Sequence, residues 1–252
     1  MILRHITEHV KAQNWLAIAI DFVIVVVGVF IGIQVSNWNA ARALSALERE
    51  KLAELRIELE EAVSDTRQWQ AFLGGVSAAG ERSLAFLERG EACTDDCWRV
   101  LVGFFHASQL TDVTVSRETY DAMRRMGLPR SRAVVSALDR YYALNAAIAA
   151  NLNERPAYRN LARSLIPVGT QRVLWLGCHD SEATIETFDK DCPSGVSDEA
   201  ARKAVDAILA EPDLARTLTQ WTAVGVPRDR FLADQNGLAA EAIAAIDAEL
   251  RR

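Results

Sequence analysis

The sequence predicts an all-α protein with one transmembrane helix near its N-terminus and a helical bundle after it. One long apolar stretch is followed by a chain in which apolar residues recur at helical spacing. Only 13 Gly and 6 Pro occur among 252 residues, so few positions interrupt helices. With no repeat of 33 or 34 residues visible, these observations favour a bundle over a solenoid.

Charge and motif content exclude several classes of protein. The chain has 28 Lys and Arg against 34 Asp and Glu, a net charge of −6. Binding to nucleic acid needs clustered basic residues, and the sequence has only short basic runs, so nucleic acid is not an expected partner. Phosphate-binding loops, dinucleotide fingerprints and the HExxH and GxSxG motifs are absent from the sequence. We therefore expect no enzymatic activity, no cofactor and no metal.

The first predicted element is a transmembrane helix over residues 15–38. Residues 15–35 are apolar except for Asp21 and Gln34, and such a helix is roughly 30 Å long, enough to cross a lipid bilayer. A tryptophan at each end suits the level of the headgroups. A cleaved signal peptide is the alternative, since residues 41–43 offer an A-x-A triplet, but its apolar region would be only about 7–15 residues long.

The four cysteines indicate the direction of the anchor. All follow the apolar stretch and form two sequence-local pairs, Cys93 with Cys97 and Cys178 with Cys192, which is typical of disulfides made in an oxidising compartment. A zinc site is the alternative, but C-x3-C and C-x13-C differ from the usual paired spacing. We therefore expect a single-pass protein of a bacterial inner membrane, with residues 1–14 in the cytoplasm and residues 39–252 in the periplasm.

A heptad pattern after the anchor predicts that the helix continues into a stalk. Apolar and small residues alternate in steps of three and four, with charged residues on the other faces. Gly74-Gly75 predicts a kink or a break in this helix, because each Gly costs about 1 kcal/mol relative to Ala. A short second run then ends at Gly90. The predicted seam comprises Leu52, Leu55, Leu59, Ala62, Thr66, Trp69, Leu73 and Val76.

The rest of the chain predicts the helices of the bundle. A helix holds the apolar face from Trp98 to Phe105, and Ser116 precedes another that ends at Gly127. A long helix begins at Ser131, with a kink near Pro156 and an end at Pro167. Residues 168–196 are expected to be the least regular part. Further helices begin at Ser197 and at Pro212, and the apolar face of the last one is Phe231, Leu238, Ile243, Ile246 and Leu250.

Two segments carry a resemblance to a known family. IDFVIVVVGVFIGIQVSNWN and TYDAMRRMGLPRSRAVVSALDRYY are similar to a bacterial family of uncharacterised single-pass membrane proteins, described only as a domain of unknown function. The anchor of that family typically ends in Gln-x-x-x-Trp-Asn followed by Glu, whereas Ala40 occupies the Glu position here. The resemblance covers the anchor, the middle and weakly the C-terminal helix. It implies an N-terminal anchor with a helical periplasmic domain and supplies no activity.

One face of the predicted anchor combines small residues with an acid. Asp21, Gly28, Gly32 and Ser36 follow one another at helical spacing, and small residues four apart allow close contact between membrane helices. An ionised carboxylate inside a bilayer costs about 2.5–3.5 kcal/mol. We expect this face to contact a second copy of the chain or another membrane protein, with Asp21 holding the interface. The alternative is that Asp21 carries protons, as a similarly placed Asp does in subunits of ion-driven motors.

The sequence thus favours a non-enzymatic, membrane-anchored interaction module, an accessory, adaptor or sensing subunit of a membrane complex. One alternative is a subunit of an ion-driven membrane complex that uses Asp21. Another is a periplasmic hydrolase or metal enzyme that uses His179 and the nearby Asp180, Glu182 and Glu186. We expect a solvated loop at these positions and no catalytic or metal-binding role for His179 or His106.

Overall fold

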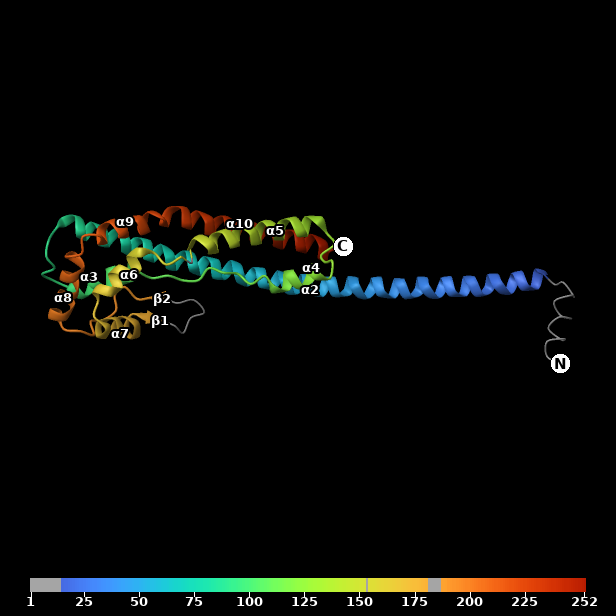
Figure 1. Ribbon diagram of the computed structural model, residues 1–252, viewed down its shortest axis with the longest axis horizontal. Helices are drawn as coiled ribbons and strands as arrows, with labels where there is room; N and C mark the ends of the chain where they lie inside the picture. The colour runs from blue at the N-terminus through green and yellow to red at the C-terminus, as the bar shows by residue number, and fades with distance from the viewer. Residues whose placement is uncertain (1–14, 153, 181–186) are drawn as a thin grey trace. The chain divides into compact units, whose positions relative to one another are not determined.

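The computed structural model describes residues 15–152, 154–180 and 187–252, and these residues form an all-α chain with one pair of antiparallel strands, each two residues long (Figure 1). The chain divides into two units, Met1–Lys51 and Leu52–Arg252. The predicted cytoplasmic segment, residues 1–14, lies outside the described residues. The elements are α2 (Trp15–Arg89), α3 (Cys97–Ala107), α4 (Glu118–Arg125), α5 (Arg132–Leu152), α6 (Ala157–Leu165), α7 (Val168–Gly177), β1 (His179–Asp180), β2 (Thr187–Phe188), α8 (Asp198–Leu209), α9 (Leu214–Ala223) and α10 (Gly225–Leu250).

The part of α2 in the first unit leaves its apolar side chains exposed. Phe22, Ile24 and Phe30 are each about 60% or more exposed, with values of 69%, 62% and 59%. Within the described residues, α2 is the one helix long and apolar enough to cross a membrane. A soluble protein rarely exposes so continuous an apolar surface, because transfer of such side chains from water to an apolar phase is favourable.

The part of α2 in the second unit buries the predicted heptad seam. All eight seam residues are at most 8% exposed, and Leu52 and Leu55 are fully buried. They form core of the second unit, where the sequence predicted a stalk. The break predicted at Gly74-Gly75 is wrong, since α2 continues to Arg89 and ends before Gly90, whose φ is +65°. A Cβ on Gly75 would lie 3.4 Å from Cε1 of His106, so close packing offsets the poor helix propensity of glycine there.

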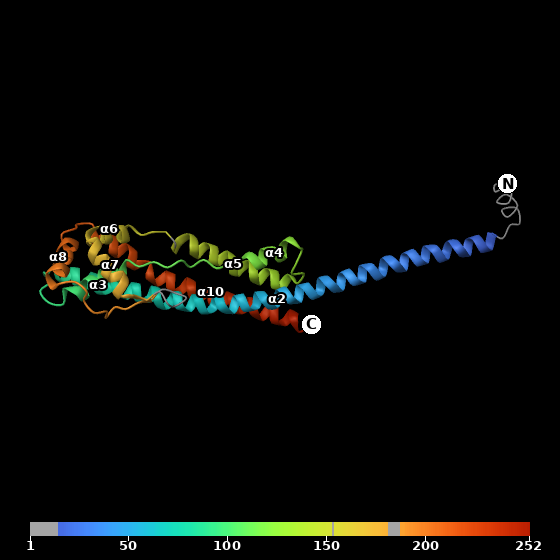
Figure 2. The same ribbon diagram turned by 90° about the horizontal axis from the view of Figure 1, so that it is seen from below.

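Helices α5 and α10 lie side by side along α2 residues 52–76 (Figures 1 and 2). The buried face of α10 repeats in steps of four and three, a spacing that places residues on one side of a helix. Small alanines in this seam allow the close approach of α5. Of the predicted face, Ile246 is buried and Leu238, Ile243 and Leu250 are partly buried against this core, whereas Phe231 is 45% exposed, so the prediction is wrong at Phe231. The buried residues of α10 are Arg228, Leu232, Gln235, Ala239, Ala242 and Ile246.

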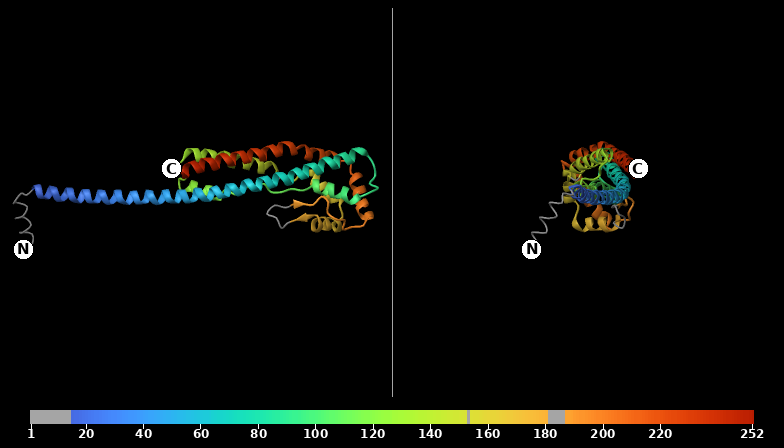
Figure 3. Two further views of the ribbon diagram at one scale, coloured as in Figure 1. Left: turned by 180° about the vertical axis from the view of Figure 1, so that it is seen from behind. Right: turned by 90° about the vertical axis from the view of Figure 1, so that its right-hand side faces the viewer.

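The other end of the second unit packs the short helices α3, α6, α7, α8 and α9 around a second apolar core (Figure 3). Buried aromatic residues also satisfy backbone carbonyls there. Trp221 Nε1 donates to the carbonyl of Ala107 over 2.8 Å, and the Tyr158 hydroxyl donates to that of Phe104 over 2.8 Å. Such bonds fix the position of each ring, because an unpaired buried polar group would be costly.

Two local predictions in this region need correction. The long helix predicted from Ser131 to Pro167 is two helices, α5 and α6, because Pro156 adopts an extended conformation and caps α6. Residues 168–177, predicted to be irregular, form α7, which begins directly after Pro167. Proline fits this position because it lacks the N–H that a first helical turn leaves unpaired. Ser197 caps α8 as predicted, accepting a hydrogen bond from the Ala200 N–H over 3.2 Å.

Candidate functional site

The predicted transmembrane face occupies one side of α2. At 3.6 residues per turn, Asp21, Gly28, Gly32 and Ser36 fall within about 80° of arc. All four are exposed, and a Cβ built on either glycine would meet no atom within 4 Å beyond the adjoining residues and backbone of α2. This face is therefore a shallow strip, open to contact by another helix, with a carboxyl group near one end.

The end of the apolar stretch is marked by an aromatic and a cation. Trp38 is 60% exposed, and the guanidinium carbon of Arg42 lies 4.6 Å from the centroid of its indole ring. An indole with a cation over its face is amphipathic and suits the boundary between hydrocarbon and water. From Asp21 to Trp38 the helix rises about 26 Å at 1.5 Å per residue.

The cysteines pair as the sequence predicted. The sulfur atoms are 2.11 Å apart in Cys93–Cys97 and 1.93 Å apart in Cys178–Cys192, and all four residues are at most 5% exposed. The indole N–H of Trp98 donates to the carbonyl of Cys192 over 3.0 Å, which ties the two disulfide regions together. No free cysteine remains in the chain.

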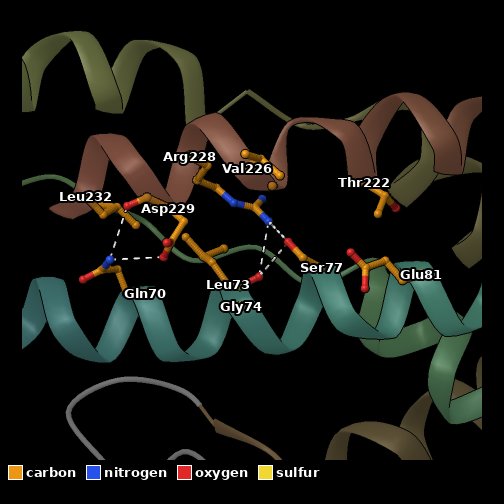
Figure 4. A pocket seen from close by; sticks show the side chains of 11 residues that line it. Gln70, Leu73, Gly74, Ser77, Glu81, Thr222, Val226, Arg228, Asp229 and Leu232 are labelled. Atoms are coloured by element: carbon orange, nitrogen blue, oxygen red, sulfur yellow. Dashed lines mark hydrogen bonds between the residues drawn. The ribbon is translucent and has the colours of Figure 1, made fainter. Parts of the chain in front are cut away.

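A groove in the second unit gathers polar groups from α2 and α10 (Figure 4). It has a volume of about 270 Å³ and is lined by Leu73 and Leu232 as well as by polar side chains. Arg228 extends from α10 toward α2, where Nη2 donates to Ser77 Oγ over 2.7 Å and to the Leu73 carbonyl over 3.2 Å. The other polar side chains of the groove are Gln70, Glu81, Thr222 and Asp229.

Arg228 is a buried cation without an ion pair among the described residues. The side chain is 2% exposed, its Nη1 is buried with no hydrogen-bond partner, and its guanidinium carbon lies 4.9 Å from the ring centroid of Trp221. Burial lowers the pKa of Arg228 to about 10, which leaves the guanidinium charged at neutral pH. Removing such a charge from water costs several kcal/mol, and hydrogen bonds to neutral oxygens offset this only in part.

Two glycines let α2 approach α9 and the start of α10 closely at this groove. A Cβ on Gly80 would meet Thr222, with the Thr222 Cγ2 at 3.2 Å. A Cβ on Gly225 would lie 2.5 Å from Ser77 Oγ and 3.7 Å from Arg228 Nη2. A Cβ at either position would force the side chain of Thr222 or Ser77 to shift, so the present geometry of the groove depends on both glycines.

The predicted histidines lie apart from the groove. His106 is 5% exposed and stacks on Phe188 with ring centroids 4.6 Å apart, and burial lowers its pKa to about 4. His179 packs edge-on against Trp175. Glu182 and Glu186, predicted to lie in the same loop as His179, are outside the described residues. Within the part of the chain that the structure describes, no cluster of three or more His, Cys, Asp or Glu side chains could hold a metal ion.

Sequence reasoning did not find Arg228. The signal was present in the sequence, because the buried residues of α10 recur in steps of four and three. Arg228 lies one such step of four before Leu232, so it belongs to the same side of the helix as Leu232 and Ala239. The predicted buried face of this helix held only large apolar residues, among them Phe231, and Arg228 was not considered. Comparisons of the chain with protein-family models, with curated proteins and with solved structures find no match.

Proposed function

We propose that the chain is a membrane-anchored helical interaction module, an accessory, adaptor or sensing subunit of a complex in a bacterial inner membrane. Residues 15–38 cross the bilayer, with residues 1–14 in the cytoplasm and the second unit in the periplasm. The module is not an enzyme, and it associates with a second copy or with another membrane protein through the face of Asp21, Gly28, Gly32 and Ser36.

The observation that carries this proposal is the exposed apolar surface of α2 in the first unit, interrupted on one side by the acid and the small residues. A lipid bilayer is the phase in which such a surface is stable. Small residues let helix backbones approach closely there, and a carboxyl group can hydrogen-bond across the interface. The buried cysteine pairs support an oxidising compartment for the second unit.

A second candidate function is a subunit of an ion-driven membrane complex in which Asp21 carries protons. The favouring observation is the position of this acid within an otherwise apolar helical stretch, where an ionisable residue is costly unless it has a role. The two candidates differ in what Asp21 must supply. An interface needs its hydrogen bonds, whereas transport needs its proton.

Three variants of the anchor separate these candidates. Asp21→Asn keeps the shape and hydrogen-bonding groups of the side chain but cannot release a proton. Hydrogen bonds between membrane helices contribute about 0.6 kcal/mol on average and up to about 1.7 kcal/mol, so we expect Asp21→Asn to retain most association. Asp21→Leu and Gly28→Leu should lose more, because one removes the hydrogen bonds and the other blocks close approach.

Two properties are measured for each variant. One is crosslinking of the full chain in membranes, and the other is whether the variant restores the cellular phenotype that is lost when the chain is deleted. Val27→Leu, which changes size outside the small-residue face, is the matched control and should behave as wild type. If all three variants crosslink as efficiently as wild type, the interface is refuted. Intact crosslinking with complete loss of function in Asp21→Asn alone would favour proton transport instead.

A further inference from the structure

We propose that the groove over Arg228 binds a small zwitterionic solute, one that carries a carboxylate and an ammonium group as a free amino acid does. This inference deepens the sensing role of the proposed function and rests on it for the biological meaning of binding. The binding itself is a property of the second unit and does not depend on association of the anchor.

Arg228 lacks a counter-charge in an ion pair among the described residues. Arg228 donates from Nη2 to two neutral oxygens, and no described carboxylate forms an ion pair with it. Asp229, the next residue, has its Oδ1 engaged by Gln70 Nε2 over 3.1 Å. A ligand carboxylate is the group that a buried guanidinium recognises best, because charge-assisted hydrogen bonds are roughly twice as strong as neutral ones.

The rest of the groove lining favours a ligand that carries both charges. Glu81 and Asp229 also line the groove, on opposite sides of Arg228 in Figure 4. A plain anion would meet these two carboxylates and be repelled, whereas an ammonium group beside the ligand carboxylate would be attracted to them. The Thr222 Oγ1, buried without a hydrogen-bond partner among the described residues, is a further polar group in this lining.

The volume of the groove limits the size of the ligand. Pockets for drug-sized ligands have volumes of about 300–1,000 Å³, and the groove, at about 270 Å³, lies just below this range. It therefore suits a small solute. Leu73 and Leu232 supply an apolar surface for the carbon atoms of such a solute.

The test is calorimetric titration of the full chain, purified in mild detergent, with named probes. Glycine, L-serine and L-glutamine carry both charges, while acetate and methylammonium each carry one. We expect saturable binding of at least one amino acid, with acetate and methylammonium at least about tenfold weaker, since each forms only half of the charge contacts. The midpoint temperature of thermal unfolding should rise with the same ligand, as expected when only the folded state binds it.

Variants of the groove assign the binding to it. Arg228→Gln and Glu81→Gln should each weaken binding by about tenfold or more, because each removes one charged contact. Arg163→Gln is the matched control, since Arg163 is another partly buried arginine stacked on aromatic rings and lies outside the groove lining. Glu81 is exposed, so its variant keeps the test decisive if Arg228→Gln does not fold.

Three results would overturn the inference. The first is no saturable heat with glycine, L-serine or L-glutamine up to about 10 mM, a concentration that would detect binding as weak as a Kd of about 1 mM. The second is binding that Glu81→Gln leaves unchanged, and the third is acetate binding as tightly as the amino acids. Each would leave crosslinking of the anchor unchanged, so failure here is distinguishable from failure of the proposed function.

Discussion

Two stretches of α2 place apolar side chains in opposite surroundings. In residues 20–35 they surround the helix, interrupted on one side by Asp21 and the small residues, and Phe22 is 69% exposed. In residues 52–79 they follow a seam with charged residues between them, and Leu55 is fully buried. One continuous helix thus has an exposed and a buried apolar stretch, and the period of its apolar residues distinguishes them. A seam indicates burial by other helices of the same chain, whereas uniform apolarity indicates a surrounding apolar phase.

The largest effect is expected at the buried seam. Leu55→Ala should lower the free energy of unfolding of the second unit by about 2–5 kcal/mol, because it leaves a cavity among packed helices. Ile24→Ala, at a residue 62% exposed in the first unit, should leave that free energy unchanged. Denaturant unfolding of the full chain in detergent, followed by circular dichroism, measures both. Equal effects of the two substitutions would contradict the contrast.

Both disulfides lie in the second unit, so their removal should destabilise this unit alone. Cys178→Ser with Cys192→Ser should cost about 3 kcal/mol, the loop-closure entropy of the 14-residue separation. Cys93→Ser with Cys97→Ser should cost less, about 2 kcal/mol, because that separation is 4. Thermal unfolding of each double variant gives the values, and non-reducing peptide mapping verifies the wild-type pairing. Free thiols at all four positions in cells would argue against an oxidising compartment.

A smaller effect is expected from the buried histidine. Burial lowers the pKa of His106 from 6.5 to about 4, so the unfolded chain binds a proton there that the folded chain does not. The folded state therefore loses stability as pH falls below about 6.5, by about 2 kcal/mol between pH 7 and pH 5. His106→Gln removes this contribution, so its unfolding free energy should fall less than that of wild type over the same interval. Parallel pH dependences would show that His106 titrates normally.

The sequence predicted what depends on local spacing and missed what depends on tertiary contacts. The apolar part of α2 follows from the length and composition of one stretch of sequence, and the seam from Leu52 to Val76 follows from periodicity. The cysteine pairs follow from proximity along the chain. The continuity of α2 through Gly74-Gly75 could not be predicted from local spacing. It depends on His106 and Thr222, which come from distant segments and pack against Gly75 and Gly80. The groove was unpredictable for the same reason, since Ser77 and Arg228 meet only after α2 and α10 pack together.

Alkaline extraction of membranes tests the proposal that residues 20–35 of α2 lie in a lipid bilayer. The full chain should remain in the membrane pellet after treatment at high pH, which strips proteins held only by surface contacts. A Val26→Lys, Val27→Lys double variant should appear in the soluble fraction with its second unit folded, because each lysine costs about 2.5–3.5 kcal/mol at the centre of a membrane helix. Complete release of the wild-type chain would contradict the account.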